Sequence, residues 1–259
     1  VSHGTSRRRA PYGCGAEDAT FKVCRSLAAR RAGARRASVD PADDPLEQEL
    51  ACFAEAFLPT AEDRHRKSHL LDVIAEAARE VVDSGSRIYP FGSSVNGCGE
   101  AQADVDAVFI VPPDSELRQA PYLLRLMAEA TEGRPLQVIE KRLNARVPVL
   151  TLELLDEDGS ETACTCDLTI SNLLPVYNSR LLRSYVELMP SLSVLVTVVK
   201  RWAKALGVAK TYEGFISPYS WTLMVVYYLQ VCHGLPSLHA MAQKATQRVD
   251  QYYNVDFVS

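Results

Sequence analysis

The sequence predicts an α+β fold, in which a mixed-sheet unit is followed by a mainly helical unit with a cleft between them. Three observations predict it. Short runs rich in β-branched and aromatic residues gather between residues 87 and 170, as is typical of strands. One helical pattern, near 121–132, interrupts these strands, so the unit is expected to mix helix and sheet. Apolar residues recur at helical spacing before this region and again from residue 176 onward.

Two helices are predicted ahead of the strands, over 45–58 and 62–83. The second helix carries an apolar stripe and is expected to end at Gly85, because glycine commonly follows a helix C-terminus. The stripe consists of Leu70, Leu71, Ile74, Ala77, Ala78 and Val81.

A loop of small residues follows the first predicted strand, Arg87–Phe91. Gly92, Ser93 and Ser94 leave the main chain open to a ligand, and successive backbone N–H groups in such a turn form a concave site for anions. Residues 94–100 are expected to form a short helix whose N-terminal dipole adds to this site. Taken alone, the loop reads equally well as an ordinary turn.

Asp104 and Asp106 open the next predicted strand, 104–111, which is apolar, β-branched and followed by Pro112. Side chains alternate across a strand, so both carboxylates lie on one face. Carboxylates this close repel each other unless a cation lies between them. Oxygen ligands of this kind suit Mg²⁺ (or Mn²⁺), which commonly shares its coordination shell with substrate phosphates. The alternative, a pair of solvated aspartates, is disfavoured by the loop directly before them.

A third carboxylate, Asp167, is predicted on a later strand, 163–170. Cys164, Cys166 and Leu168 alternate with it, so Asp167 lies on the polar face. By itself it reads as a surface residue on an edge strand. Beside the first two aspartates, it is the further acid that a two-metal centre needs.

The helical half is expected to begin after a linker over 172–179, whose Asn178 or Ser179 caps the following helix. Residues 191–206 form an amphipathic helix that ends at Gly207. Lys200 and Lys204 are four residues apart and therefore share one face of it. A solvated cationic helix end is the alternative interpretation of this pair.

A further helix is predicted from Ser217, a good N-cap, with Pro218 as its first residue. Tyr219 falls in the first turn, where its ring can face a cleft rather than the core. Tyr227 and Tyr228, farther along, are expected to be packed in the core.

The order of these motifs resembles the DNA polymerase β-like nucleotidyltransferases: Gly-Ser, a spacer, Asp-x-Asp and a third Asp on a later strand. The amino-acid sequence of Phe91–Glu100, together with Ala103–Asp106, most resembles that of the terminal uridylyltransferases of trypanosomatids. The resemblance extends over about residues 45–259. The resemblance implies that the three aspartates hold two Mg²⁺ ions. One ion would activate an RNA 3′-hydroxyl, and the other would neutralise the triphosphate of UTP and the leaving pyrophosphate.

The resemblance also implies a set of nucleotide-binding residues. The loop residues would contact the β- and γ-phosphates, the lysine pair would hold the triphosphate, and the tyrosine would stack on uracil. Pro218 stands where the family has a serine, and Ser217 is the candidate to replace that serine. Arg146 would lie near the reacting ends, or alternatively on a strand surface. The full set is Phe91, Gly92, Ser93, Ser94, Arg146, Asn178, Ser179, Lys200, Lys204, Ser217 and Tyr219.

The domain organisation follows from these elements and the resemblance. Residues 1–40 are expected to form a flexible basic leader, and 41–60 a helix that packs on the helical unit, as in the family. Residues 61–175 would form the catalytic domain and 176–259 a base-binding helical domain that is incomplete at its C-terminus. The acidic pair that helps trypanosomatid enzymes to select uracil would lie beyond this sequence.

Charge is distributed unevenly along the chain. Residues 1–37 contain nine Lys or Arg and two acids, a charge of +7, which leaves −4 − 7 = −11 for the remainder. An Arg-rich, acid-poor leader is typical of mitochondrial targeting segments, or of an arm that contacts RNA phosphates. We expect a mitochondrial location, with the cytoplasm as the alternative.

Composition excludes several classes of protein. A hydrophobic share of 47% and a charged share of 23% are those of a globular protein. No apolar run approaches membrane-spanning length, so no membrane partner is expected. Seven cysteines, an odd number at scattered spacings, favour a reducing compartment over a disulfide framework.

Three functions stay open at this point. The first is template-independent transfer of UMP from UTP to the 3′ end of single-stranded RNA, with or without membership of a larger RNA-processing complex. The second is a noncanonical poly(A) polymerase, which would use the same metal site. The third is a non-catalytic RNA-binding scaffold with the same fold, which the retention of all three carboxylates and both lysines disfavours.

Overall fold

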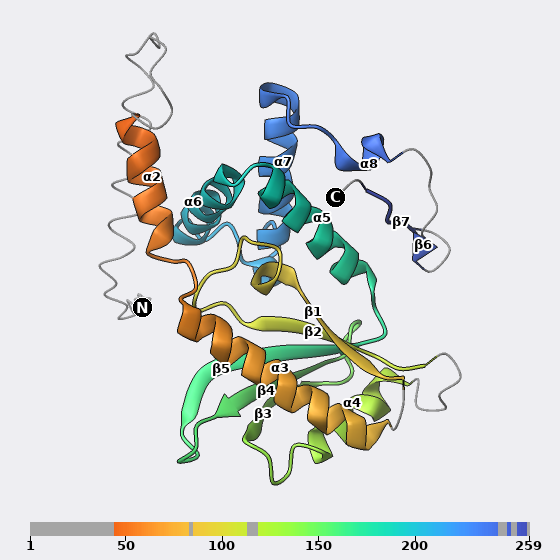
Figure 1. Cartoon of the computed structure of the whole chain (residues 1–259). Coiled ribbons are helices and arrows are strands. Elements are labelled where there is room, and N and C mark those ends of the chain that lie inside the picture. The colour runs from red at the N-terminus through yellow and green to blue at the C-terminus, as the bar shows by residue number, and fades with distance from the viewer. Residues whose placement is uncertain (1–43, 83–84, 113–118, 243–247, 250–252, 258–259) are drawn as a thin grey trace, which may run out of the picture.

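The fold is α+β, as predicted, and pairs a five-stranded mixed sheet with a group of helices (Figure 1). The computed structural model describes residues 44–82, 85–112, 119–242, 248–249 and 253–257. The expectations for the basic leader therefore lie outside the described residues.

The sheet has the strand order β1-β2-β5-β4-β3. β2 and β5 are parallel, and the other neighbours are antiparallel. β5 is thus the central strand, so the reading of Asp167 as an edge-strand residue is wrong. The strands are β1 (Arg87–Phe91), β2 (Val105–Ile110), β3 (Leu136–Arg142), β4 (Val149–Leu155) and β5 (Glu161–Ile170).

Two helices, α3 (Ala61–Val81) and α4 (Ala120–Glu129), pack on this sheet and share its core. The core takes alternate residues of the central strands, because alternate side chains of a strand point to one face. These strand residues are Val105, Ala107, Phe109, Cys164, Cys166 and Leu168. The intervening residues of β2 and β5, including Asp106 and Asp167, face the other way. α4 ends at Glu129, earlier than predicted, and the Thr131 hydroxyl donates to the carbonyl of Ala128 just beyond its end.

The remaining helices form a second group above the sheet with its own core (Figure 1). α2 ends three residues earlier than predicted and lies along α6. α5 contacts the end of β1 and the loop after it, which brings the helical group against the sheet at that point. The helices are α2 (Pro45–Glu55), α5 (Leu174–Leu188), α6 (Ser191–Ala205), α7 (Pro218–His233) and α8 (Leu238–Met241).

Several local predictions were wrong. The predicted linker over 172–179 is mostly helix, because α5 already begins at Leu174. Residues 94–100 form no helix: a 3-10 turn, Gly92–Ser94, is followed by an irregular loop in which the Asn96 side chain accepts from the amide of Cys98. The region after 176 is also not wholly helical, since it includes the short strands β6 (Arg248–Val249) and β7 (Tyr253–Asn254).

The prediction that Tyr227 and Tyr228 lie in the core was also wrong. They are 67% and 43% exposed, because the buried stripe of α7 runs along a different face of the helix, through Thr222, Val225, Val226 and Leu229. Among the described helices, none alone is long and apolar enough to cross a membrane, and only α5 and α6 taken together, bent by 119°, reach that length and composition.

Candidate active site

The predicted phosphate loop, residues 92–100, begins at Gly92, which lies directly against Asp106. Gly92 has a φ of +74°, a left-handed conformation that favours glycine. A Cβ atom at this position would collide with Oδ2 of Asp106. The glycine therefore lets the loop pass close to the carboxylate.

The register of the sheet places two of the predicted aspartates side by side. Asp106 pairs with Asp167 across the parallel strands β2 and β5, and Phe91 pairs with Asp106 from the other side. Asp104 immediately precedes β2, two residues before Asp106. All three carboxylates therefore lie at one place on the face of the sheet opposite to α3 and α4.

The electrostatics of Asp106 reflect this arrangement. Burial raises the pKa of its carboxyl to about 6, with further contributions from the negative charges of Asp167 and Asp104. Like charges that approach this closely disfavour ionisation unless a cation is present.

The other two aspartates have partners that the sequence did not indicate. Asp104 accepts a hydrogen bond from the Thr165 hydroxyl. Asp167 accepts from Thr151 Oγ1 at 2.6 Å and from Arg142 Nη2 at 3.0 Å. Cross-strand pairing is the signal that would have found the threonines, because Thr151 is the register partner of Asp167 in β4.

The donor set fits a hard divalent cation. Among the described residues, no three His, Cys, Asp or Glu side chains are arranged to hold a metal ion in this conformation. Asp104 and Asp167 instead point to the hydroxyl and guanidinium partners given above. Three carboxylates on neighbouring strands, one with a raised pKa, nevertheless form the all-oxygen donor set that Mg²⁺ or Mn²⁺ prefers.

A cavity of about 690 Å³ opens over these carboxylates and is lined by both halves of the molecule. The sheet side contributes the three aspartates, Ser93 and Glu100, and the helical side contributes Lys200 and Lys204. The two lysines and the three aspartates thus line one cavity. Additional lining residues, absent from the predicted set, are Gln102, Ala103, Arg201, Ala209, Lys210, Thr211, Tyr212 and Pro218.

The remaining predicted residues take varied places. Ser179 is buried inside α5 and caps no helix: its hydroxyl accepts from the amide of Gly92 at 2.7 Å and donates to the carbonyl of Pro175 at 2.7 Å. Asn178 precedes it in the same helix. Ser94 donates to the carbonyl of Phe91.

Three further residues lie toward the margins. Ser217 is the N-cap of α7, as predicted, and accepts from the amide of Ser220. Tyr219 is 43% exposed in the first turn of α7 and is not among the residues that line the cavity. Its neighbour Pro218, and Tyr212 in the preceding 3-10 turn Thr211–Glu213, line the cavity instead. Arg146 is exposed in the turn between β3 and β4 rather than on a strand, and Arg142 is the arginine that reaches Asp167.

Comparison with known proteins places this geometry in a family. Residues 46–187 match the family described as poly(A) RNA polymerase, mitochondrial-like, central palm domain. The chain belongs to this family. The match includes the phosphate loop and all three aspartates, and it ends just before α6, which carries the lysine pair.

Proteins similar to this chain include both a terminal uridylyltransferase and poly(A) RNA polymerases. The chain is 32% identical over 152 residues to terminal uridylyltransferase cid1 of Schizosaccharomyces pombe, covering 57% of this chain and 36% of that protein. It is 32% identical over 205 residues to poly(A) RNA polymerase GLD2-A of Xenopus laevis, covering 76% of this chain and 38% of that protein. The chain therefore spans little more than a third of these relatives. Neither is trypanosomatid, so that part of the resemblance stays a prediction.

Solved structures show the same fold. The Cid1 poly(U) polymerase superposes with a TM-score of 0.73 at 23% identity, over 84% of this chain and 65% of that one. The GLD-2–GLD-3 noncanonical poly(A) polymerase complex superposes with a TM-score of 0.62 at 28% identity, over 73% of this chain and 60% of that one. Membership of the poly(U)/poly(A) polymerase group of nucleotidyltransferases is thus supported by both sequence and fold.

Proposed function

We propose that this chain transfers UMP from UTP to the 3′-hydroxyl of single-stranded RNA without a template and releases pyrophosphate. The observation that supports nucleotidyl transfer is the juxtaposition of Asp106 and Asp167 on parallel strands, in a cavity that Lys200 and Lys204 also line. The similarity to terminal uridylyltransferase cid1 favours UMP as the transferred group. Carboxylates and cationic side chains in one cavity suit a nucleoside triphosphate bound with divalent metal ions. The carboxylates would bind the metal ions, and the lysines would contact the phosphates.

Each side of the cavity has a distinct part in this reaction. Ser93 and the left-handed turn at Gly92 hold the β- and γ-phosphates by hydroxyl and backbone N–H groups. Lys200 and Lys204 offset the charge of the triphosphate from the helical side. The catalytic contribution of these residues is mainly positioning and charge stabilisation, as is usual for phosphoryl-group chemistry.

Asp104, Asp106 and Asp167 are the residues that would hold two Mg²⁺ or Mn²⁺ ions. Such ions activate the attacking hydroxyl and stabilise the leaving pyrophosphate. For Asp167 to act as a ligand, its carboxylate would exchange the contact with Arg142 for the metal. The Arg142 side chain is 44% exposed and would keep its ion pair with Glu140.

A second candidate function is poly(A) polymerase activity, favoured by the match of 76% of the chain to GLD2-A. The metal site is common to both activities, so the nucleotide base decides between them. A panel of the four ribonucleotide triphosphates, each supplied with Mg²⁺ and a labelled single-stranded RNA, separates the two. Preferential incorporation of ATP over UTP would replace the first proposal with the second.

The catalytic proposal itself is tested with aspartate variants. Asp167→Ala should abolish extension while UTP binding stays measurable, because the lysines and the phosphate loop remain. Asp104→Ala should likewise lose extension. If the wild-type protein extends no RNA with any nucleotide, and Asp104→Ala changes no measured property, the chain is better described as a non-catalytic RNA-binding scaffold.

Two further proposals concern the protein partners of this chain and its location in the cell. The GLD-2 proteins were solved together with GLD-3 and with RNP-8. We propose that this chain also acts within a larger RNA-processing assembly, in the mitochondrion. Co-purification of the full-length protein from fractionated cells tests both points.

A further inference from the structure

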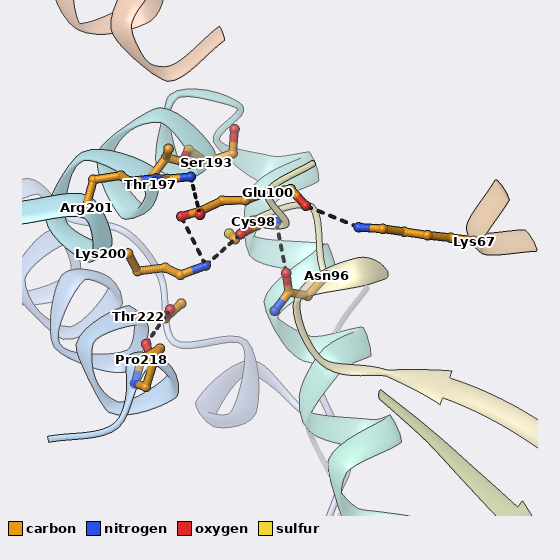
Figure 2. A network of polar contacts seen from close by, with 10 residues as sticks. All are labelled: Lys67, Asn96, Cys98, Glu100, Ser193, Thr197, Lys200, Arg201, Pro218 and Thr222. Atoms are coloured by element: carbon orange, nitrogen blue, oxygen red, sulfur yellow. Dashed lines mark hydrogen bonds and ion pairs between the residues drawn. The ribbon is translucent and has the colours of Figure 1, made fainter. Parts of the chain in front are cut away.

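Glu100 closes the loop that begins at Gly92, and its carboxylate lies between that loop and α6 (Figure 2). Its side chain is only 13% exposed. One oxygen, Oε2, is 2.6 Å from Nη2 of Arg201, and the other, Oε1, is 4.0 Å from Nζ of Lys200. A single acid from the loop thus faces two consecutive cations of the helix.

The backbone of the same loop is tied to two helices. Lys200 Nζ donates to the carbonyl oxygen of Cys98 at 3.1 Å, and Lys67 Nζ of α3 donates to that of Glu100 at 3.2 Å (Figure 2). The Asn96 side chain accepts from the amide of Cys98 at 2.8 Å, which fixes the turn between them. The loop is therefore held from the sheet side and from the helical side together.

Arg201 is anchored on its other side by an aromatic ring. Its guanidinium carbon lies 3.8 Å from the centroid of Phe57, and the Phe57 carbonyl accepts from the amide of Ala101, next to Glu100. The Arg201 side chain is 18% exposed, and its Nε atom is buried without a hydrogen-bond partner among the described residues. A buried pair of this kind carries a desolvation cost, so its net contribution to stability is small, and it acts mainly by specifying one arrangement.

The arrangement specified is the distance between the phosphate loop and the lysines. Arg201 directly follows Lys200, and Lys204 lies one turn farther along the same helix. Fixing Arg201 to Glu100 therefore helps to fix the position at which α6 presents both lysines to the cavity that Ser93 and the aspartates share.

We propose that Glu100 is a positioning residue, which sets α6 against the phosphate loop so that Lys200 and Lys204 are placed for a nucleoside triphosphate before it binds. This inference rests on the proposed function. It extends that function because it assigns a role to a cavity-lining acid that is outside the predicted set of metal- and nucleotide-binding residues. Its effect should depend on the phosphates of the ligand, because the residues it places are the ones that face the phosphates.

Glu100→Gln keeps the shape of the side chain and removes its charge. We expect the dissociation constant of Mg²⁺–UTP, measured by titration calorimetry, to rise about tenfold, a change of ~1.4 kcal/mol. The dissociation constant of UMP should change by less than about twofold, since UMP lacks the β- and γ-phosphates. In extension assays KM for UTP should rise with kcat largely retained.

Two further variants keep the test informative if Glu100→Gln unfolds. Glu100→Asp keeps the charge and should give a smaller loss of UTP affinity than Glu100→Gln. Arg201→Met keeps an apolar contact with Phe57 and should give the same selective loss for UTP, with no additional loss in the double variant. Glu187→Gln is the matched control, because it breaks the exposed Arg183–Glu187 pair, 2.6 Å long, on α5 and should leave both ligands unaffected.

The outcomes separate this inference from the proposed function. Unchanged UTP affinity in Glu100→Gln, or equal losses for UTP and UMP, would overturn the positioning role while the enzyme assignment stands. Wild-type protein that binds no nucleoside triphosphate with Mg²⁺ would overturn both. A loss that is confined to UTP and shared by Arg201→Met supports the inference.

Discussion

At the scale of single residues, the lack of a Cβ atom at Gly92 permits both the left-handed backbone conformation and the close approach to Asp106. Alanine there would adopt a φ of +74°, which costs about 1–3 kcal/mol, and its Cβ would displace the Asp106 carboxylate. Because small displacements at a reacting centre can cost ~10²-fold in rate, we expect Gly92→Ala to lose about that much in primer extension. Gly133→Ala is the control: its φ is +76°, but an added Cβ would meet no atom within 4 Å beyond the neighbouring residues in the chain, so activity should persist. Equal loss in both variants would contradict the contact with Asp106.

Asp106 provides a prediction about pH. Its folded-state pKa of about 6 is above the ordinary 3.8, so the fold disfavours the ionised form. Without metal, the free energy of unfolding of the wild type should therefore fall as pH rises from about 4 to about 6 and then level off. Asp106→Asn should lack this fall and be more stable at pH 8 by about 1–3 kcal/mol. Urea denaturation in EDTA at pH 5 and pH 8 measures the difference. A variant less stable than wild type at pH 8 would contradict the prediction.

The sequence predicted the charged residues of the site better than their neighbours. Asp104, Asp106 and Asp167 stood out because carboxylates on an apolar strand have an electrostatic cost that calls for a cation. Thr151, Thr165 and Arg142, which the structure adds, are unremarkable in sequence. Their importance arises only from the cross-strand register, which is set by long-range pairing.

At the scale of elements, α3 begins with a capping box that links sequence to stability. The Thr60 side chain accepts from the amide of Asp63 at 3.1 Å, and the Asp63 carboxylate accepts from the amide of Thr60 at 2.8 Å. We expect Thr60→Ala to lower the free energy of unfolding by about 1 kcal/mol, and Thr60→Ser to be nearly neutral. Thermal unfolding followed by circular dichroism measures both. Equal losses in the two variants would show that the methyl group, not the hydroxyl, matters.

The same box has a pH dependence of opposite sign to that of Asp106. Hydrogen bonds from Thr60 lower the pKa of Asp63 below its ordinary value of 3.8. Its contribution to stability is present above that pH and is lost as pH falls through the lowered pKa. The difference between wild type and Thr60→Ala should therefore shrink in strong acid.

The boundaries of helices were predicted correctly where a local sequence signal marks them. They were predicted wrongly where contacts with distant residues determine where the helix begins. Ser217 and Pro218 mark the start of α7, and the structure begins that helix as predicted. Residues 172–179 have polar residues and a proline, which favour a linker, yet α5 begins at Leu174. Contacts absent from the local sequence stabilise it there, among them the hydrogen bond from Gly92 to Ser179 across 87 positions.

At the scale of the whole molecule, the α+β organisation was predictable because the strand and helix patterns occupy separate stretches of chain. The way in which the sheet and the helices contact each other was not predictable from the sequence. The Glu100–Arg201 ion pair and the Gly92–Ser179 hydrogen bond join residues about 90–100 positions apart. These contacts converge on the phosphate loop. The loop is therefore a part of the molecule that joins the sheet to the helices.

A ligand that contacts both halves should stabilise the whole fold. UTP with Mg²⁺ at about 100 times its dissociation constant adds ~2.7 kcal/mol to the free energy of unfolding, which raises Tm by several degrees in a protein of this size. UTP in EDTA should give much less, because the three carboxylates then repel the triphosphate. The Lys200→Ala/Lys204→Ala double variant should lose most of the shift even with Mg²⁺, whereas Lys141→Ala, on β3 and outside the cavity lining, should keep it. Differential scanning fluorimetry across a UTP titration makes the measurement. A full shift in the double variant would mean that the nucleotide binds the sheet alone, and that the cavity between the halves is not its site.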